Sequence, residues 1–407
     1  MNCRSCGNPL QIVFADLGEC PPSNSYLSAE QLAKPEAVYP LKVFVCERCF
    51  LVQVDEYMRA TEIFDSKYAY FSSYSKTWLD HARRYVEMAT ERFGLGSDSQ
   101  VVEIASNDGY LLQYFVAKQI PVLGIEPTTS TAAAARERNV ETREVFFGVD
   151  TAKQLVAEGK QADLLLGNNV LAHVPDINDF VAGLKIALKP GGTITLEFPH
   201  LLQLIRENQF DTIYHEHFSY LSLYAAHAIF VRHGLTIFDV EELPTHGGSL
   251  RIYAAHSEEI RAETAAFNVV LADEMSAGID SLELYSGFQK RVDAVRDAVL
   301  KFISDTKIEG KTVAAYGAAA KGNTLLNYCG ATNNDISFVV DASPHKQGLY
   351  LPGSHIPIVD DSQLKLQKPD YVIILPWNLK SEIAAQLDYV REWGGRLVTA
   401  IPTMCIF

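Results

Sequence analysis

Short apolar runs alternate with amphipathic stretches along most of this chain, a pattern typical of α/β folds. Residues 100–105 predict a buried strand, which leads through a polar turn at 106–109 into a helix over 110–116. A second strand over 122–126 ends in the acid Glu126. A strand, a tight turn onto a helix and a second strand ending in a carboxylate together predict a nucleotide-binding βαβ unit, whose acid accepts ribose hydroxyls.

The same rhythm continues in two blocks, separated by an acidic, Ala-rich helical connection. The expected elements of the first block are a helix over 76–94 and further strands over 163–169 and 193–197, and those of the second block are strands over 311–316, 336–341 and 371–375. Strands that alternate with helices in this way build parallel sheets covered by helices on both faces. We therefore expect two Rossmann-like α/β domains, of which the second is smaller.

Two cysteine pairs precede these blocks, Cys3-x-x-Cys6 and Cys46-x-x-Cys49. Each pair suits a tight turn whose two thiolates face one tetrahedral zinc, and two such turns complete a closed four-sulfur site. Four thiolates leave no open coordination position, so the expected zinc is structural rather than catalytic. Cys20 is an alternative ligand, although no spacing argument favours it.

Composition narrows the classes of protein and of partner. Hydrophobic residues make up 48% and charged residues 21% of the 407, as in soluble globular proteins. A formal net charge of −15 disfavours a nucleic-acid partner. The N-terminus shows no apolar signal region and no apolar run has the length of a bilayer span, so we expect a cytoplasmic protein without a membrane partner. Its cysteines are then expected as metal ligands or free thiols, and a monomer is favoured.

The run Tyr214-His215-Glu216-His217 follows the strand at 193–197, where substrate-facing residues gather in open parallel sheets. Imidazole holds or releases a proton near neutral pH, whereas a His-x-His pair can also bind a metal. The spacing differs from the His-Glu-x-x-His of helical zinc proteases. Three roles stay open for the run, namely general base with substrate contacts, plain packing, and metal binding, and the first is favoured.

The second block begins with a small-residue turn, Gly317-Ala318-Ala319-Ala320-Lys321-Gly322-Asn323. Backbone amides at such a turn onto a helix, with a lysine among them, suit a phosphate or diphosphate. A tight strand–helix turn with a solvated lysine is an equally good interpretation.

The order of these motifs resembles known enzymes. The acid after the second strand and the Lys-Pro-Gly-Gly turn are similar to class I S-adenosylmethionine-dependent methyltransferases. The zinc pairs, Glu-Ile-Ala-Ser-Asn-Asp-Gly at 103–109, the Tyr-His-Glu-His run, His-Gly-Gly-Ser-Leu-Arg at 246–251 and the turn at 317–322 together resemble the nucleotide-sugar C-methyltransferases, including the TDP-4-keto-deoxysugar 3-C-methyltransferases. The resemblance covers essentially the whole chain.

This resemblance implies three domains. They are a small zinc-binding module at 1–67, a class I methyltransferase Rossmann-like domain at 68–256 and a smaller Rossmann-like nucleotide-sugar-binding domain at 257–407. It also implies S-adenosylmethionine as cofactor and a TDP-linked 4-keto sugar as substrate. The implied cofactor-binding residues are Glu103, Asn107, Asp108, Gly109, Glu126, Pro127, Phe146, Phe147, Asn168 and Asn169. Among them Asn107 and Asp108 are expected at the ammonium and carboxylate, Glu126 at the ribose, and Phe146 and Phe147 beside the adenine.

The implied reaction is methylation of C-3 through an enolate, because a proton beside a ketone is acidic enough for a protein base. His217 is expected to remove that proton, with Glu216 orienting the imidazole and the Tyr214 hydroxyl stabilising the enolate oxygen. Tyr68 is expected in the same pocket, whereas His215 has no assigned role. The implied substrate-binding residues are Tyr70, His173, His246, Arg251, Gly317, Lys321 and Asn323.

Two other functions stay open from the sequence. One is an O- or N-methyltransferase of a sugar or another small molecule, which needs a base but no keto group. The other is a zinc-ribbon adaptor that carries a non-catalytic methyltransferase fold. The acid Glu126 and the intact turn around Asn107 speak against the adaptor.

Overall fold

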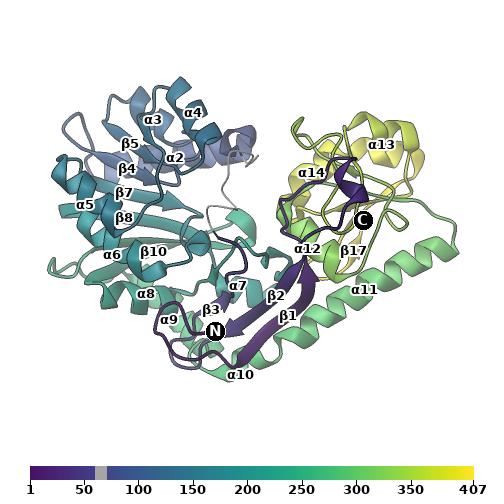
Figure 1. Ribbon diagram of the computed structural model, residues 1–407, viewed down its shortest axis with the longest axis horizontal. Helices are drawn as coiled ribbons and strands as arrows, with labels where there is room; N and C mark the ends of the chain where they lie inside the picture. The colour runs from purple at the N-terminus through teal and green to yellow at the C-terminus, as the bar shows by residue number, and fades with distance from the viewer. Residues whose placement is uncertain (60–70) are drawn as a thin grey trace.

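The computed structural model describes residues 1–59 and 71–407, and the predicted site residues Tyr68 and Tyr70 lie outside these ranges. Three sheets organise the chain (Figure 1). A seven-stranded sheet and a six-stranded sheet stand on opposite sides, and the long helix α11 (Phe288–Ile308) runs along the lower edge toward the six-stranded sheet. A four-stranded sheet near the N-terminus lies between them. The α/β prediction is therefore confirmed.

The seven-stranded sheet has the order β10-β11-β8-β7-β4-β5-β6. Its strands are β4 (Val101–Ile104), β5 (Val122–Ile125), β6 (Thr142–Arg143), β7 (Ala162–Asn168), β8 (Leu188–Pro199), β10 (Leu235–Leu243) and β11 (Ser249–His256). Strands β4 to β8 pair in parallel, and β11 is antiparallel to both of its neighbours. The chain order reverses direction between β4 and β7, and in doubly wound sheets such a point opens a crevice at the carboxyl ends of the strands.

The central strands are apolar throughout because both faces of the sheet are covered. Side chains of neighbouring residues on a strand point to opposite faces. Leu164 and Leu166 pack in one cluster with helices on the first face, whereas Leu165 packs in the cluster on the other face. The helices of this domain are α2 (Lys76–Arg92), α3 (Leu112–Ala117), α4 (Thr129–Glu137), α5 (Val149–Ala157), α6 (Ile177–Ala187), α7 (Leu201–Arg206) and α8 (Leu223–Arg232).

The N-terminal sheet is completed by a strand from a distant part of the chain. It consists of β1 (Ile12–Cys20), β2 (Tyr39–Val45), β3 (Val52–Val54) and β9 (Ser219–Tyr220), in that order. Strand β9 pairs antiparallel with β3, with Ser219 opposite Gln53. The Tyr214–His217 run directly precedes β9, so it lies where the N-terminal sheet meets the seven-stranded sheet.

The six-stranded sheet has the order β14-β13-β12-β15-β16-β17. Its strands are β12 (Val313–Tyr316), β13 (Val339–Val340), β14 (Ile358–Val359), β15 (Tyr371–Ile374), β16 (Arg396–Thr399) and β17 (Cys405–Ile406), and its helices are α12 (Ala320–Tyr328), α13 (Ser362–Gln367) and α14 (Lys380–Gln386). All of these strands pair in parallel except β17. Helix α10 (Leu282–Ser286) precedes α11, whereas α9 (Ala265–Ala277), which lies beyond the predicted boundary at 256, packs on α8 and β10.

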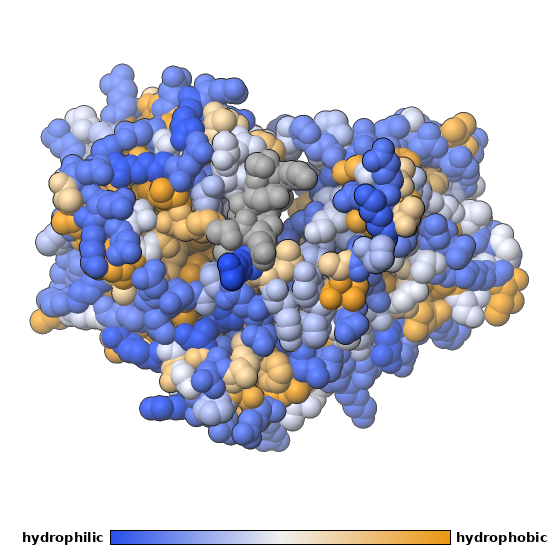
Figure 2. Space-filling view, viewed as in Figure 1, coloured by the Kyte–Doolittle hydropathy of each residue, from blue (hydrophilic) through white to orange (hydrophobic). Residues whose placement is uncertain are grey.

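Hydrophilic residues cover most of the surface seen in this view, and apolar residues occur in small separate groups (Figure 2). Within the described residues, no helix combines the length and the apolar character needed to span a bilayer.

Candidate functional site

A cavity of about 940 Å³ opens where the three sheets meet. One side is formed by the carboxyl ends of β4, β5 and β7, and the opposite side by the N-terminus of α12. Residues 212–217, which lead into β9, lie between these sides. A cavity of this size holds two small molecules side by side, as a transfer reaction requires.

The cysteine pairs form one compact cluster, as predicted. The ligand atoms of Cys3, Cys6, Cys46 and Cys49 all lie within 4.8 Å of one another, and the Sγ atoms of Cys3 and Cys49 are 3.5 Å apart. Zinc–sulfur bonds of about 2.3 Å in a tetrahedron need sulfur atoms just under 4 Å apart, so the cluster fits zinc with no open position. The Cys20 thiol lies outside it and contacts the Leu17 carbonyl at 3.7 Å.

The zinc-binding turn touches the loop that carries a predicted substrate residue. The Arg4 guanidinium, between Cys3 and Cys6, donates to the carbonyl of Pro175 at 2.8 Å. It also donates to the Val54 carbonyl. His173 lies two residues before Pro175, so the zinc module supports this wall of the cavity from behind.

The cofactor side of the cavity follows the carboxyl ends of β4, β5 and β7. Both oxygens of the buried Glu126 carboxylate accept from backbone amides, those of Asn107 and Thr128, at 2.9 Å each. The predicted cofactor residues that line the cavity are Asn107, Glu126, Pro127, Phe146, Phe147, Asn168 and Asn169. These residues include two phenylalanines, an acid and amides at the ends of strands. Together they fit a ligand with an aromatic base, a ribose and a polar end.

Three of the predicted cofactor residues shape the turn from behind instead of lining the cavity. Glu103 is fully buried, and burial raises the pKa of its carboxyl well above the ordinary value. Asp108 accepts from the Ser73 hydroxyl and forms an ion pair with Arg138 at 3.3 Å. These partners occupy the carboxylate that was expected at the cofactor ammonium or carboxylate. Gly109 has φ +74°, and a Cβ there would meet Val140 at 3.1 Å.

The His217 imidazole has a defined tautomer. Nδ1 lies 2.9 Å from the carbonyl oxygen of Thr212, and because a carbonyl only accepts, Nδ1 carries the hydrogen. Nε2 therefore holds the lone pair, and it accepts from the Tyr214 hydroxyl at 2.7 Å. Burial and the neighbouring His173 lower the pKa of His217 well below its usual range, which keeps the imidazole neutral. A neutral imidazole whose lone pair is on Nε2 can accept one proton there.

In the same run, Glu216 does not have the expected role, whereas His215 gains one. Glu216 does not orient His217, because both imidazole nitrogens have other partners; its carboxylate instead accepts from Asn24 Nδ2 at 2.7 Å. Burial raises the pKa of Glu216 to about 7. His215 packs edge-on against Tyr39, with ring centroids 6.0 Å apart, and is a packing residue.

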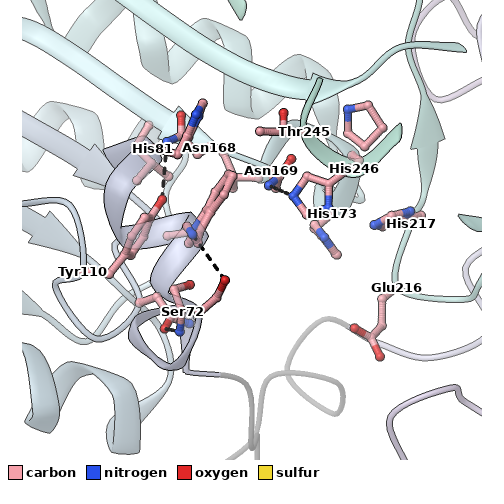
Figure 3. Close-up of a pocket in the computed structure, with 18 of the residues that line it drawn as sticks. Ser72, His81, Tyr110, Asn168, Asn169, His173, Glu216, His217, Thr245 and His246 are labelled. Carbon is pink, nitrogen blue, oxygen red and sulfur yellow. Dashed lines mark hydrogen bonds between the residues drawn. The ribbon is translucent and has the colours of Figure 1, made fainter. Parts of the chain in front are cut away.

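Two further predicted substrate residues bring imidazoles to the same place (Figure 3). His173 meets His217 edge to face, with ring centroids 4.6 Å apart. His246 Nε2 lies 2.8 Å from Asn169 Nδ2. Burial lowers the pKa of His173 and of His246 to about 4, so both rings are neutral near pH 7.

Lys321 reaches this cluster from the opposite domain. Its ammonium lies 3.4 Å from the His246 carbonyl oxygen and 3.0 Å from Asn378 Oδ1. It also lies over the Trp377 ring, 4.7 Å from the centroid. Burial lowers the pKa of Lys321 to about 8, and the Asp211 carboxylate opposes that shift. The lysine is thus a half-buried cation in the cavity wall, not a fully solvated one.

The remaining predicted residues have structural contacts. Arg251 lines the cavity, but its guanidinium forms ion pairs with Glu197 at 3.0 Å and Glu241 at 2.8 Å. Asn323 does not line the cavity and donates to the Ser23 carbonyl at 2.6 Å. Gly317 also lies outside the lining; its φ of +91° and close approach to Pro376 require glycine.

The residues that line the cavity but were not predicted from the sequence include Asn24, Thr212 and Lys346. Thr212 acts on His217 through its main-chain carbonyl, which no residue type reveals. Lys346 lines the cavity near Lys321 and donates to the Ala318 carbonyl at 2.7 Å. Lys346 could have been predicted, because it follows β13, which pairs with β12, and the carboxyl ends of parallel strands gather at one edge of the sheet.

Three protein-family models match consecutive parts of the chain. Residues 3–64 match the model described as "Putative zinc binding domain", residues 78–240 match "Methyltransferase domain" and residues 244–402 match "C-methyltransferase C-terminal domain". The chain is 36% identical to C-methyltransferase NovU of Streptomyces niveus over 400 residues, which cover 98% of this chain and 95% of that protein.

More distant similarity is confined to part of the chain. A ubiquinone biosynthesis O-methyltransferase of Rhodopseudomonas palustris is 24% identical over 117 residues, 29% of this chain and 46% of that protein. The solved structure of magnesium protoporphyrin IX methyltransferase from Synechocystis PCC 6803 covers 44% of this chain and 79% of its own, with 14% identity and a TM-score of 0.34.

Proposed function

We propose that this chain, which belongs to the C-methyltransferase family, methylates C-3 of a nucleotide-linked 4-keto-deoxysugar with His217 as the base. As a member of this family it is an S-adenosylmethionine-dependent enzyme with a structural zinc. The substrate, the position methylated and the base are the proposal. The observation that carries it is the tautomer of His217, whose only lone pair, on Nε2, meets the Tyr214 hydroxyl in the cavity wall.

Forming a carbon–carbon bond requires a nucleophilic carbon, and a ketone makes the adjacent C–H acidic enough to supply one. S-adenosylmethionine, when bound, supplies an electrophilic methyl group on its sulfonium. His217 Nε2 takes the C-3 proton while Nδ1–H stays on the Thr212 carbonyl, which stabilises the charged imidazole. The Tyr214 hydroxyl, which donates to Nε2 at 2.7 Å, leaves Nε2 when the substrate proton arrives.

The opposite side of the cavity supports a diphosphate-bearing substrate. Lys321 and Lys346 are cations of the cavity wall, and the N-terminus of α12 presents Ala319 and Ala320 to the same space. Cations and helix N-terminal amides are the groups that bind phosphate oxygens. A TDP-linked sugar would then span the cavity, with the diphosphate at α12 and the sugar beside His217.

A panel of nucleotide-linked 4-keto sugars, incubated with S-adenosylmethionine and analysed by mass spectrometry and NMR, tests the proposal. One substrate is expected to gain a methyl group on C-3. His217→Asn is the sharp variant, because its amide can still donate to Thr212 but offers no base. We expect it to bind S-adenosylmethionine like the wild type and to lose methyl transfer by at least about 100-fold. Methylation at an oxygen or nitrogen, or full activity of His217→Asn, would overturn the proposal.

A further inference from the structure

We infer that His246 donates its Nδ1–H to the C-4 oxygen of the substrate as negative charge develops there, and so stabilises the enolate that His217 generates. This inference rests on the proposed function and assigns a catalytic role to a residue expected only to contact substrate. It also replaces Tyr214 as the expected donor to that oxygen, since the Tyr214 hydroxyl donates to His217 Nε2.

The ring orientation of His246 supplies the donor. Asn169 presents its amide NH₂ to Nε2 at 2.8 Å, so Nε2 accepts and the ring hydrogen resides on Nδ1. Figure 3 shows His246 and His173 between Asn169 and His217, within the residues that line the cavity. Because His217 and His246 both line the cavity, a substrate whose C-3 proton meets His217 can present its neighbouring carbonyl to His246.

The backbone holds the imidazole in place at a cost. His246 has φ +55° and ψ +15°, and Gly247 and Gly248 follow with φ of +92° and +120°. A non-glycine residue in the left-handed region is strained, because its Cβ comes too close to the following carbonyl oxygen. Such a conformation persists only where surrounding contacts determine it, and it occurs most often at functional sites.

Those contacts come from three directions. The Thr245 hydroxyl donates to the buried Glu197 at 2.8 Å, and Glu197 is itself paired with Arg251. Gln209 Nε2 donates to the Gly247 carbonyl at 2.7 Å. A Cβ on Gly247 would come within 2.3 Å of the Trp377 ring, so this loop fits closely against the opposite domain. The ion pairs of Arg251 thus position His246.

A neutral imidazole suits this task. Burial and the nearby Lys321 lower the pKa of His246 to about 4, so the ring offers a hydrogen bond at neutral pH. A neutral donor stabilises the enolate oxygen without transferring a proton to it. The step is balanced: the C-3 proton moves to His217 Nε2, the C–H electron pair forms the C3–C4 double bond, and the carbonyl π pair moves to the C-4 oxygen.

The test separates enolisation from methyl transfer. TDP-4-keto-6-deoxyglucose is incubated in D₂O with enzyme and S-adenosylhomocysteine, and loss of the C-3 proton signal is followed by NMR. In place of His, Asn puts its amide near Nδ1, where its NH₂ can donate, whereas Gln puts its amide near Nε2, where its oxygen accepts from Asn169. His246→Gln is therefore expected to slow exchange by about 100-fold or more, the loss typical for one oxyanion donor. His246→Asn is expected to stay within about tenfold of the wild type, with unchanged S-adenosylhomocysteine affinity in both variants.

Each outcome has a defined meaning. Wild-type exchange at C-3 with an unaffected His246→Gln variant would overturn this inference and leave the proposed function standing. Absence of wild-type exchange with TDP-4-keto-6-deoxyglucose and with every other sugar of the panel would count against the proposed function itself. Nitrogen-15 NMR of histidine-labelled wild-type enzyme reads the tautomer without any variant of His246 having to fold. A proton on Nε2 instead of Nδ1 would overturn the inference, and a proton on Nδ1 supports it.

Discussion

Replacing Arg4 by alanine tests whether the zinc-binding turn positions the loop that carries His173. The guanidinium donates to the carbonyls of Pro175 and Val54 and lies 5.3 Å from the Phe218 ring centroid. A hydrogen bond from a charged donor contributes about 1.5–3 kcal/mol and a cation–π contact about 0.5–1 kcal/mol or more. Desolvation offsets part of this gain, as the lowered pKa of Arg4 indicates. We expect Arg4→Ala to lower the free energy of local opening by about 3 kcal/mol, which raises the equilibrium constant for opening this loop by at least about 100-fold.

Hydrogen–deuterium exchange of peptides covering residues 171–178 measures that opening, and zinc content is determined on the same samples. Arg48→Ala is the matched control, because Arg48 lies in the second zinc-binding turn but is exposed. Arg4→Ala is expected to speed exchange in these peptides and to release zinc faster to a chelator, whereas Arg48→Ala changes neither. Equal exchange at 171–178 in both variants, with zinc retained, would refute the link between the zinc turn and this loop.

Three further predictions concern the cavity. Glu126→Gln should weaken S-adenosylmethionine binding by roughly 10–100-fold in calorimetry, which is the contribution of a charged hydrogen bond. The exposed Glu137→Gln is the control, and equal affinities of the two variants would contradict the assignment of Glu126 to the ribose. Lys346→Met should raise KM for the nucleotide sugar about tenfold with little change in kcat, unlike Lys301→Met on the outer face of α11, and a loss confined to kcat would argue against substrate binding. Because burial raises the pKa of Glu216 from 4.5 to about 7, its contribution to stability is complete below pH 4.5 and is lost as the pH rises through 7. Glu216→Gln should therefore raise Tm relative to wild type at pH 8 more than at pH 5, and equal differences at the two pH values would show that the carboxyl does not titrate in this range.

Much of the candidate site was accessible from local patterns. The strand ending before Asn107 and the acid Glu126 were predicted from apolar periodicity and turn chemistry, and both border the cavity. The two cysteine pairs were predicted as one zinc cluster from their spacing, and the four sulfur atoms converge. These signals survive in the sequence because each depends on residues close together along the chain.

The partners of His217 and Lys321 were not accessible in that way. Glu216 was the expected support of His217 because it is adjacent in sequence, but residues 214–217 form a turn, closed by the His217 amide donating to the Tyr214 carbonyl at 2.9 Å, and the Glu216 carboxylate accepts from Asn24 instead. The support is the Thr212 carbonyl, which any residue type would offer. Lys321 was expected at a phosphate, yet its ammonium also lies 3.4 Å from the carbonyl oxygen of His246, 75 residues earlier in the chain.

The sequence by itself determined the α/β class, the zinc ligands and the cofactor-binding unit, and it singled out the Tyr214–His217 run as the candidate source of a base. Only the tertiary structure decided the tautomer of His217, the ring orientation of His246 and the separation of Glu216 from the imidazole. The physical reason is one of range. Periodicity and spacing record interactions within a few residues, whereas β9 pairs with β3 across more than 160 positions and thereby carries the Tyr214–His217 run into the cavity. Proton positions there depend on main-chain carbonyls and side-chain amides that meet only after the three sheets have packed together.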